Sequence, residues 1–144
     1  RDYQRTLGQH MRPIFVDSDI FIYAAGQPHP HKEPSKYFLE KAAKNQIKAI
    51  TSTEALQEIL HRYCVINDRP RGFAIFDDCI QILTVVLPLT KQDILKARQV
   101  MEKYPSVEAR DAIHISVMLN RGIKTICTYD KHFDKIEGIK RIEP

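Results

Sequence analysis

The chain has 144 residues, of which 43% are hydrophobic and 28% are charged. This length and balance are ordinary for one soluble globular domain that buries its own core. No apolar run approaches the roughly 18 residues that a membrane-spanning helix needs, so we expect a cytoplasmic protein with no membrane contact. The net charge of +4 is compatible with a phosphate-bearing partner, but the excess is too small to identify one.

The first ten residues differ from the rest of the chain. They are polar, have no apolar period and precede Met11. We interpret residues 1–10 as an expression-tag remnant or a disordered extension, and residues 11–144 as the domain.

The three cysteines Cys64, Cys79 and Cys127 are odd in number, far apart and set in apolar surroundings. They therefore indicate core thiols in a reducing compartment.

The predicted elements alternate between short strands and helices. In chain order we predict a strand at 13–16, helices at 20–25 and 34–45, a strand at 48–51, a helix capped by Ser52 or Thr53, a helix at 70–78, a strand at 80–87, helices at 90–104 and 109–120, and strands at 123–127 and 139–142. Apolar runs with β-branched side chains indicate the strands, and apolar residues three or four apart indicate the helices. The pattern predicts a three-layer α/β/α domain with a mostly parallel sheet of four or five strands.

Four acidic residues are expected at one edge of this sheet. Asp17 and Asp130 follow predicted strands, Asp111 opens a helix, and Glu58 lies one turn into the helix after the second strand. Ligands of parallel sheets bind outside the carboxyl ends of the strands, and the following helices begin at that same edge. The topology therefore directs four carboxylates toward one rim.

Clustered carboxylates repel one another unless a positive charge lies between them. Mg²⁺ or Mn²⁺ prefers oxygen ligands and is often shared with a substrate phosphate. Such ions polarise a phosphoryl oxygen and lower the pKa of a bound water. No histidine and cysteine set with zinc spacing is present in the sequence.

Four segments around these acids resemble the PIN-domain family, and VapC-type toxins in particular. Residues 13–23 resemble its opening of an apolar strand, Asp, Ser or Thr, and a helix. Residues 52–60 are similar to its Ser…Glu-Leu segment, 109–114 to its Asp-Ala-x-His-like helix start, and 125–134 to its Thr-x-Asp-x-x-Phe ending. Each motif alone is weak, but together they occur in the family's order over about residues 13–142.

The resemblance implies a metal-dependent ribonuclease with an acidic quartet. Asp17, Glu58, Asp111 and Asp130 would be catalytic and hold one or two Mg²⁺ or Mn²⁺ ions. The possible auxiliary residues are Ser18, Asp19, Thr128 and Asp134. Asp19 stands where many relatives have Asn, and for Asp134 a solvent-facing loop acid is favoured over a role in the site. The implied partners are an RNA substrate, an antitoxin that blocks the site and a second copy of the chain.

Other residues are candidates for RNA contact by their position near the rim. These are Arg62, Arg110 and Lys131, with Arg69 and Arg71 as further candidates. Ordinary surface charge explains each of them equally well. Tyr23 and Tyr129 are candidates for stacking on a base, with core packing or a dimer contact as the alternative.

Several alternatives stay open. Asp17-Ser18-Asp19 also resembles the opening of haloacid-dehalogenase-type phosphatases, in which the first Asp is a nucleophile. Further alternatives are an RNA-processing nuclease without a toxin role and a domain that only binds RNA or a partner. The Glu58-x-x-His61 and Asp111-x-x-His114 spacings are superficially those of a di-iron helix bundle, but the predicted strands argue against it. Glu54 competes with Glu58 for the acidic position.

Overall fold

The structure is a computed structural model that describes residues 11–144; residues 1–10, interpreted above as an extension, lie outside the described part. Five parallel strands form one sheet in the order β3-β2-β1-β4-β5. The strands are β1 (Pro13–Val16), β2 (Lys48–Ser52), β3 (Val85–Leu87), β4 (Thr125–Cys127) and β5 (Lys140–Ile142). The helices are α2 (Ser18–Ala25), α3 (Lys32–Ala43), α4 (Thr53–Val65), α5 (Arg69–Ile82), α6 (Lys91–Lys103), α7 (Ala109–Asn120) and the 3₁₀ turn η1 (Lys131–Lys135). The predicted α/β class and parallel sheet are confirmed.

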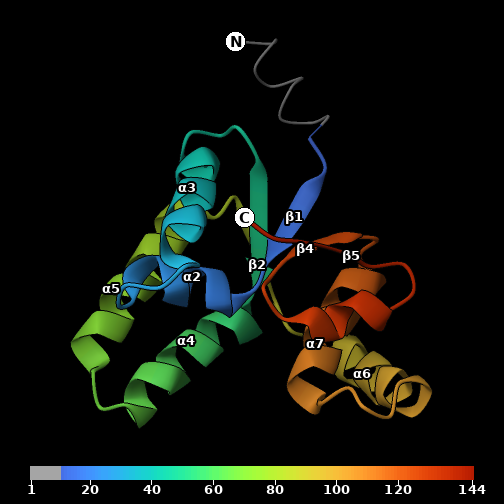
Figure 1. Ribbon diagram of the computed structural model, residues 1–144. Coiled ribbons are helices and arrows are strands. Elements are labelled where there is room, and N and C mark those ends of the chain that lie inside the picture. Colours follow the sequence, from blue (N-terminus) through green and yellow to red (C-terminus); the bar gives the residue numbers. More distant parts are fainter. Residues whose placement is uncertain (1–10) are drawn as a thin grey trace.

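The helices cover both faces of the sheet, with α2 to α5 on one side and α6 and α7 on the other (Figure 1). Side chains alternate along a strand, so each central strand contributes to two cores. In β1, Phe15 packs with α6 and α7, whereas Val16 packs with α2 to α5. In β4, Ile126 and Cys127 divide in the same way. The three central strands are thus held from both sides, which fixes where their carboxyl ends lie.

One predicted strand is wrong in most of its length. Residues 80–82 belong to α5, and only Val85–Leu87 form β3. The β-branched residues favoured a strand, but Ile75 and Cys79 are buried one helical turn apart and continue the face that packs on α4. Ile80 points away from that face and is 50% exposed. Helical periodicity therefore outweighs β propensity in this segment.

Local signals at the helix ends are better predictors. Thr90 and Asp93 form a capping box at the start of α6, where the predicted helix at 90–104 begins. Gly122 follows the last turn of α7 with a φ of +68°, a conformation in which glycine lacks the steric penalty of other residues.

The expectation that the cysteines lie in the core holds for Cys79 and Cys127, which are buried. It is wrong for Cys64, which is exposed because it lies on the outer side of α4. Among residues 11–144, no helix combines the length and apolar character needed to cross a membrane.

A glycine sets the close packing of α4 against α5. A Cβ atom added at Gly72 would lie 2.6 Å from Cβ of Tyr63. We expect Gly72→Ala to lower the free energy of unfolding by about 1–2 kcal/mol, because overpacking outweighs the gain of roughly 1 kcal/mol in helix propensity. Urea unfolding followed by circular dichroism measures this. An unchanged or higher stability would mean that the two helices separate without cost.

Candidate active site

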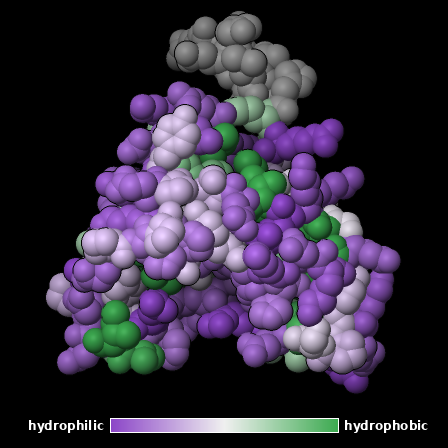
Figure 2. All heavy atoms as spheres, in the orientation of Figure 1, coloured by the Kyte–Doolittle hydropathy of each residue, from purple (hydrophilic) through white to green (hydrophobic). Residues whose placement is uncertain are grey.

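A polar cleft opens where the carboxyl ends of the central strands meet the first turns of α4 and α7. Its volume is about 450 Å³. Its titratable lining residues are Asp17, Asp19, Glu54, Glu58, His61, Arg62, Arg110, Asp111 and Asp130. Figure 2 shows the surface hollowed between the two lower lobes, which correspond to α4 with α5 and α6 with α7 in Figure 1, with hydrophilic residues around the hollow. The four acids that were predicted at one rim are therefore brought together.

Asp17 occupies the centre, directly after β1. One carboxylate oxygen, Oδ1, accepts the backbone N–H of Ser18 at 2.8 Å, which caps α2. The other, Oδ2, accepts the hydroxyl of the fully buried Thr128 at 2.8 Å. Burial raises the pKa of Asp17, against the opposing effects of His114 and of these hydrogen bonds. The side chain is held rigidly, but its negative charge is poorly compensated.

Asp19 adds a further carboxylate beside Asp17. Its Oδ2 accepts the backbone N–H of Tyr129 at 3.0 Å and lies 3.2 Å from the hydroxyl of Thr128. Its Oδ1 is buried and has no hydrogen-bond partner among residues 11–144. Burial and the charge of Asp17 raise the pKa of Asp19 to about 7. One oxygen of this buried carboxyl group is thus left without a donor.

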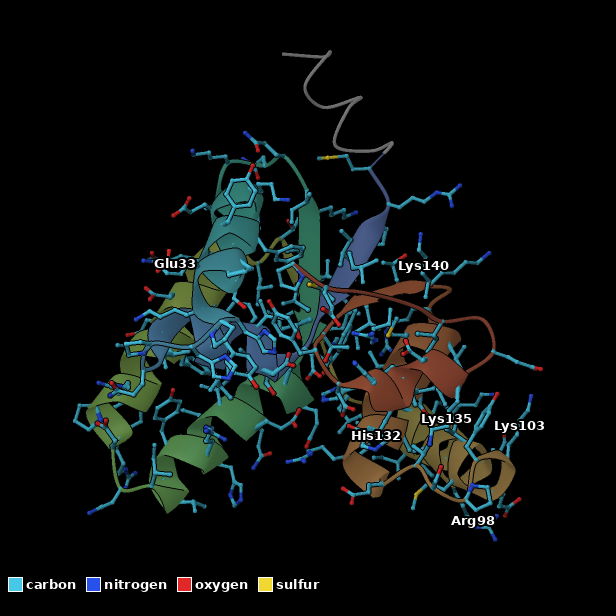
Figure 3. The ribbon with its side chains drawn as sticks, viewed as in Figure 1. Glu33, Arg98, Lys103, His132, Lys135 and Lys140 are labelled. Carbon is cyan, nitrogen blue, oxygen red and sulfur yellow. The ribbon has the colours of Figure 1, made fainter. Side chains whose placement is uncertain are left out.

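Asp111 and Asp130 form the opposite side. Asp111 lies in the first turn of α7, and Asp130 follows β4 and caps η1 by accepting the backbone N–H of His132. Nδ1 of His132 lies 2.7 Å from Oδ1 of Asp130. Burial and the charges of Asp130 and Asp17 raise the pKa of Asp111 to about 6. Figure 3 shows His132 beside α7, in the C-terminal half of the molecule.

Glu58 reaches the site from the second turn of α4. Its Oε1 contacts Nε2 of His114, and its Oε2 lies 3.4 Å from Nε of Arg110. His114 is 1% exposed and lies 3.9 Å from Oδ1 of Asp17. Burial lowers the pKa of His114, but the hydrogen bond with Glu58 and the charges of Asp17, Glu58 and Asp111 outweigh it, so the pKa is raised overall.

Some predicted residues lie elsewhere. Asp134 is outside the cleft, where it pairs with Arg141 at 2.8 Å, and Lys131 does not line the cleft either. Ser18, Asp19, Arg62 and Arg110 do line it, and Thr128 is buried beneath it. Arg71 pairs with Asp68 on the surface. The ion pairs of Arg98 and Lys103 lie at the outer end of α6, away from the cleft (Figure 3).

Four aromatic rings gather next to Asp130. Tyr129 stacks on His31 with a centroid distance of 3.6 Å, and Tyr23 contacts both rings edge-on. His29 lies 4.8 Å from both Tyr23 and His31. Packing of Tyr23 and Tyr129 was one of the two predicted alternatives, and this contact joins the loop before α3 to the end of β4.

Three features at the cleft were missed or undervalued by the sequence interpretation. His132 was not considered, and His114 was noted only for its spacing from Asp111, without any link to Glu58. Glu54 was treated only as a rival of Glu58, yet both line the cleft. The signal for His114 was its position three residues after Asp111, on the same face of α7. Its partner lies 56 residues away in the sequence, so spacing alone could not identify the contact.

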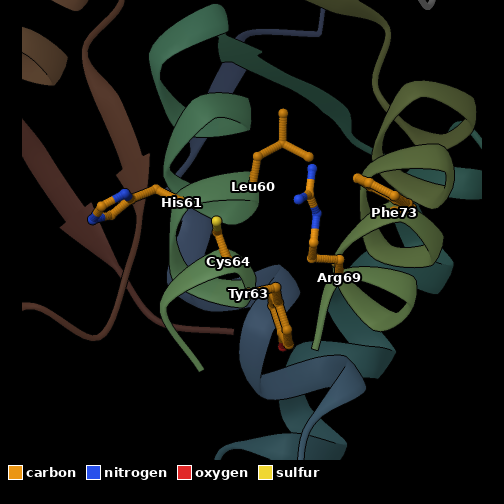
Figure 4. Close-up of a pocket in the computed structure, with 7 residues that line it drawn as sticks. Leu60, His61, Tyr63, Cys64, Arg69 and Phe73 are labelled. Carbon is orange, nitrogen blue, oxygen red and sulfur yellow. The ribbon is translucent and has the colours of Figure 1, made fainter. Parts of the chain in front are cut away.

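A second cavity, of about 280 Å³, lies between α4 and α5. Figure 4 shows Leu60, Tyr63, Cys64, Arg69 and Phe73 around it, whereas His61 points away from the others. His61 also lines the acidic cleft. Arg69 belongs to this second cavity and not to the acidic cleft.

The donor set of the cleft fits a divalent cation. Carboxylate oxygens of Asp17 and Glu58 lie within 4.8 Å of each other and of a ring nitrogen of His114, and those of Asp111 and Asp130 lie equally close to each other and to a ring nitrogen of His132. Carboxylate oxygens predominate, one of the buried ones lacks a donor, and burial together with neighbouring carboxylates raises the pKa values of Asp17, Asp19 and Asp111. A hard divalent ion satisfies such a set.

Fold and site together define a parallel α/β protein with a carboxylate cluster at the carboxyl edge of its sheet. The PIN-domain family profile matches residues 14–139, and the chain belongs to that family. It is 40% identical to ribonuclease VapC13 of Mycobacterium tuberculosis over 129 residues, which cover 90% of this chain and 98% of the relative. It is 34% identical to ribonuclease VapC23 of the same species over 117 residues, 81% of this chain and 92% of the relative. Within the PIN domains it therefore belongs to the VapC ribonucleases.

Solved structures agree on the fold. The chain is similar to one in a complex of VapBC2 from Rickettsia felis with a promoter DNA fragment, with a TM-score of 0.72, 16% identity, and coverage of 91% of this chain and 98% of that one. It is similar to VapC20 of Mycobacterium tuberculosis, a toxin that cleaves the sarcin-ricin loop, with a TM-score of 0.67, 20% identity, and coverage of 84% and 92%. Neither the phosphatase nor the di-iron alternative is retained, because the family is that of PIN domains and the fold has a parallel sheet instead of a bundle.

The crowded acids predict an unusual pH dependence of stability. The pKa of Asp111 is raised from 3.8 to about 6 on folding, so its contribution to the stability of the metal-free fold is full below pH 3.8 and is lost as the pH rises through about 6. We expect metal-free Asp111→Asn to exceed the parent by on the order of 1 kcal/mol at pH 7.5 and to match it near pH 4. Urea unfolding in EDTA at both pH values tests this, with the exposed Asp77→Asn as control. An Asp111→Asn variant less stable than the parent at pH 7.5 would contradict the argument.

Proposed function

We propose that this protein is a metal-dependent endoribonuclease that hydrolyses RNA phosphodiester bonds and acts as the toxin of a toxin–antitoxin pair. The observation that carries the proposal is the convergence of Asp17, Glu58, Asp111 and Asp130 on one cleft. Membership of the chain in the VapC ribonucleases supports the proposal further. An RNA-processing role without an antitoxin is the second candidate, since the same site serves both.

Asp17, Glu58, Asp111 and Asp130 are the proposed ligands of one or two Mg²⁺ or Mn²⁺ ions. When bound, such an ion polarises the scissile phosphoryl group and lowers the pKa of an attacking water. The residues of this chain supply the geometry. Thr128 holds Asp17 in place by donating to it, and Asp17 itself is anchored between β1 and α2. Preorganised ligands of this kind cost no rearrangement when the substrate arrives.

Two arginines at the mouth of the cleft are the proposed contacts for the RNA backbone. Arg62 and Arg110 line the cleft, and the side chain of Arg110 is 62% exposed. A guanidinium group donates several hydrogen bonds in a plane that matches phosphate. Arg110 pairs with Glu58 at 3.4 Å, so it is already directed toward the acids where the phosphate would lie.

The proposed protein partners are an antitoxin and a second copy of the chain. Several structures with the same fold are VapBC complexes, such as those from Rickettsia felis and Salmonella typhimurium. An antitoxin that covers the acidic cleft would inhibit cleavage by keeping RNA from the ligands. Co-expression with a candidate antitoxin, followed by co-purification and light scattering, tests both partners.

The first test of the activity is cleavage of total cellular RNA by the purified protein. We expect discrete products in Mn²⁺ or Mg²⁺ and none in EDTA. An Asp111→Asn protein purified in parallel should give no products, because it lacks one proposed ligand. Sequencing the ends of the products identifies the target RNA.

The other outcomes are equally informative. Cleavage by Asp111→Asn would indicate a contaminating nuclease or a wrong assignment of the site. Absence of cleavage by the parent in every metal, together with tight RNA binding, would support a domain that only binds RNA and would overturn the proposed activity.

A further inference from the structure

His114 lies beneath the acidic cleft and does not line it. It is 1% exposed, lies in the second turn of α7, and packs its ring against Phe15 at a centroid distance of 5.5 Å. Its Nε2 faces Oε1 of Glu58 and lies 3.9 Å from Oδ1 of Asp17. Among the side-chain nitrogens of residues 11–144 that contact a proposed ligand, it is the buried one, whereas those of Arg110 and His132 are on exposed side chains.

The direction of this hydrogen bond follows from the other ring nitrogen. Nδ1 of His114 is buried and has no hydrogen-bond partner among residues 11–144. A neutral ring protonated only at Nδ1 would bury an N–H without an acceptor and would also turn the lone pair of Nε2 toward the carboxylate oxygen of Glu58, so that neither nitrogen makes a hydrogen bond. In the other neutral form and in the imidazolium, Nε2 carries a proton and donates to Glu58. The contact therefore holds Glu58 in either charge state of the ring.

Glu58 needs such a partner because its side chain is long and its neighbours are acidic. Burying it next to Asp17 without a donor would leave two negative charges facing each other. Arg110 contacts the other oxygen, Oε2, but that arginine is largely exposed and therefore a weak restraint. The buried imidazole is the stronger restraint, since a hydrogen bond to a charged group gains from low local polarity.

We propose that His114 is a positioning residue, whose buried Nε2–H fixes the carboxylate of Glu58 for divalent-cation binding without itself touching the metal or the RNA. The inference rests on the proposed function, because it assigns a role within that same site. His114 adds to the acidic quartet a ring that is neutral or cationic and that contacts Glu58 from the core side of the cleft. Partners of metal-ligating carboxylates typically contribute 10–100-fold to metal affinity or activity.

The test is a set of variants whose Mn²⁺ affinity is measured by titration calorimetry, a readout that needs no RNA. His114→Leu keeps apolar bulk but removes the donor, and we expect it to bind Mn²⁺ about 10–100-fold more weakly. His114→Gln offers an N–H donor of similar reach and should recover most of that loss. His29→Leu removes an exposed imidazole outside the cleft and should bind like the parent.

A double-mutant cycle separates positioning from general packing. If His114 acts through Glu58, then adding His114→Leu to Glu58→Gln should weaken Mn²⁺ binding by less than about twofold further, since the two changes remove the same interaction. A full and independent loss in the Glu58→Gln background would overturn the proposal, and so would parent-like affinity of folded His114→Leu. Thermal unfolding of each variant identifies any that fail to fold. If His114→Leu does not fold, the Mn²⁺ affinity of His114→Gln, alone and combined with Glu58→Gln, decides the question.

The same proteins are then assayed on total cellular RNA. Loss of cleavage in His114→Leu with recovery in His114→Gln should parallel the Mn²⁺ affinities. If the double-mutant cycle shows the expected coupling between His114 and Glu58 in Mn²⁺ binding but the parent cleaves no RNA, the proposed ribonuclease activity fails while the role of His114 stands. If the parent cleaves RNA but the cycle shows no coupling, the activity stands and the role of His114 fails.

Discussion

Asp17→Asn should reduce RNA cleavage by at least about 10³-fold, because losing a metal ligand removes several kcal/mol of transition-state stabilisation and each 1.4 kcal/mol corresponds to a tenfold rate change. The substitution keeps the size of the side chain and an oxygen that accepts the backbone N–H of Ser18. Asn is also a good N-cap for α2. The fold should therefore persist while the charge at the centre of the cleft is lost.

The measurement is the initial rate of cleavage of the identified RNA at saturating Mn²⁺. Asp77→Asn, an exposed change on α5 far along the chain from the cleft residues, is the matched control and should retain the parent rate. A Tm of Asp17→Asn at or above that of the parent is expected without metal, since burial raises the pKa of Asp17 and its charge opposes folding. Cleavage within tenfold of the parent would remove Asp17 from the proposed ligand set.

The second large effect is on stability and concerns a buried ion pair far from the chemistry. Asp93 is 1% exposed and accepts hydrogen bonds from Arg121 at 2.8 and 3.1 Å, from Asn120 at 2.9 Å and from the backbone of Thr90 at 2.9 Å. It links the start of α6 to the end of α7, the helix that carries Asp111. We expect Arg121→Met to lower the free energy of unfolding by about 3–5 kcal/mol, because it leaves a buried carboxylate without its cation.

This pair also has a pH signature. Burial raises the pKa of Asp93, but Arg121, Asn120 and Thr90 outweigh it and hold the pKa well below its ordinary value of 3.8. The stabilisation is therefore full above about pH 4 and is lost as the pH falls below that value. Urea unfolding from pH 7 down to pH 3 should show a steeper loss in the parent than in Asp93→Asn. Parallel pH profiles of the two proteins would refute the role of the pair.

The two predicted effects separate the roles of the acids. Asp17 and Asp111 are destabilising groups that are kept for the proposed chemistry, and their pKa values are raised. Asp93 is a structural acid, and its pKa is lowered. Perturbed pKa values occur both at functional sites and in structural ion pairs, and in this protein the direction of the shift separates the two. All three residues are aspartates near a helix start, so the sequence does not distinguish them by type.

The sequence by itself determined the fold class and the placement of the acidic quartet on one edge. Strand and helix order, read from apolar periodicity, was enough because parallel strands must point their carboxyl ends the same way. Thr90 and Asp93 marked a helix start for an equally local reason. The segment at residues 80–82 was misread, because β propensity is a local signal whereas the burial of Ile75 and Cys79 is decided by packing on α4.

Only the tertiary structure decided which side chains complete the site. The contacts of His114 with Glu58 and of Thr128 with Asp17 join residues 56 and 111 positions apart, and no local pattern encodes such pairs. Asp134 left the set of site residues because Arg141, on the neighbouring strand β5, pairs with it. Element order places backbone ends at one edge of a sheet, whereas side-chain partners depend on which neighbours the packing of α4, α7 and β4 brings within hydrogen-bond distance.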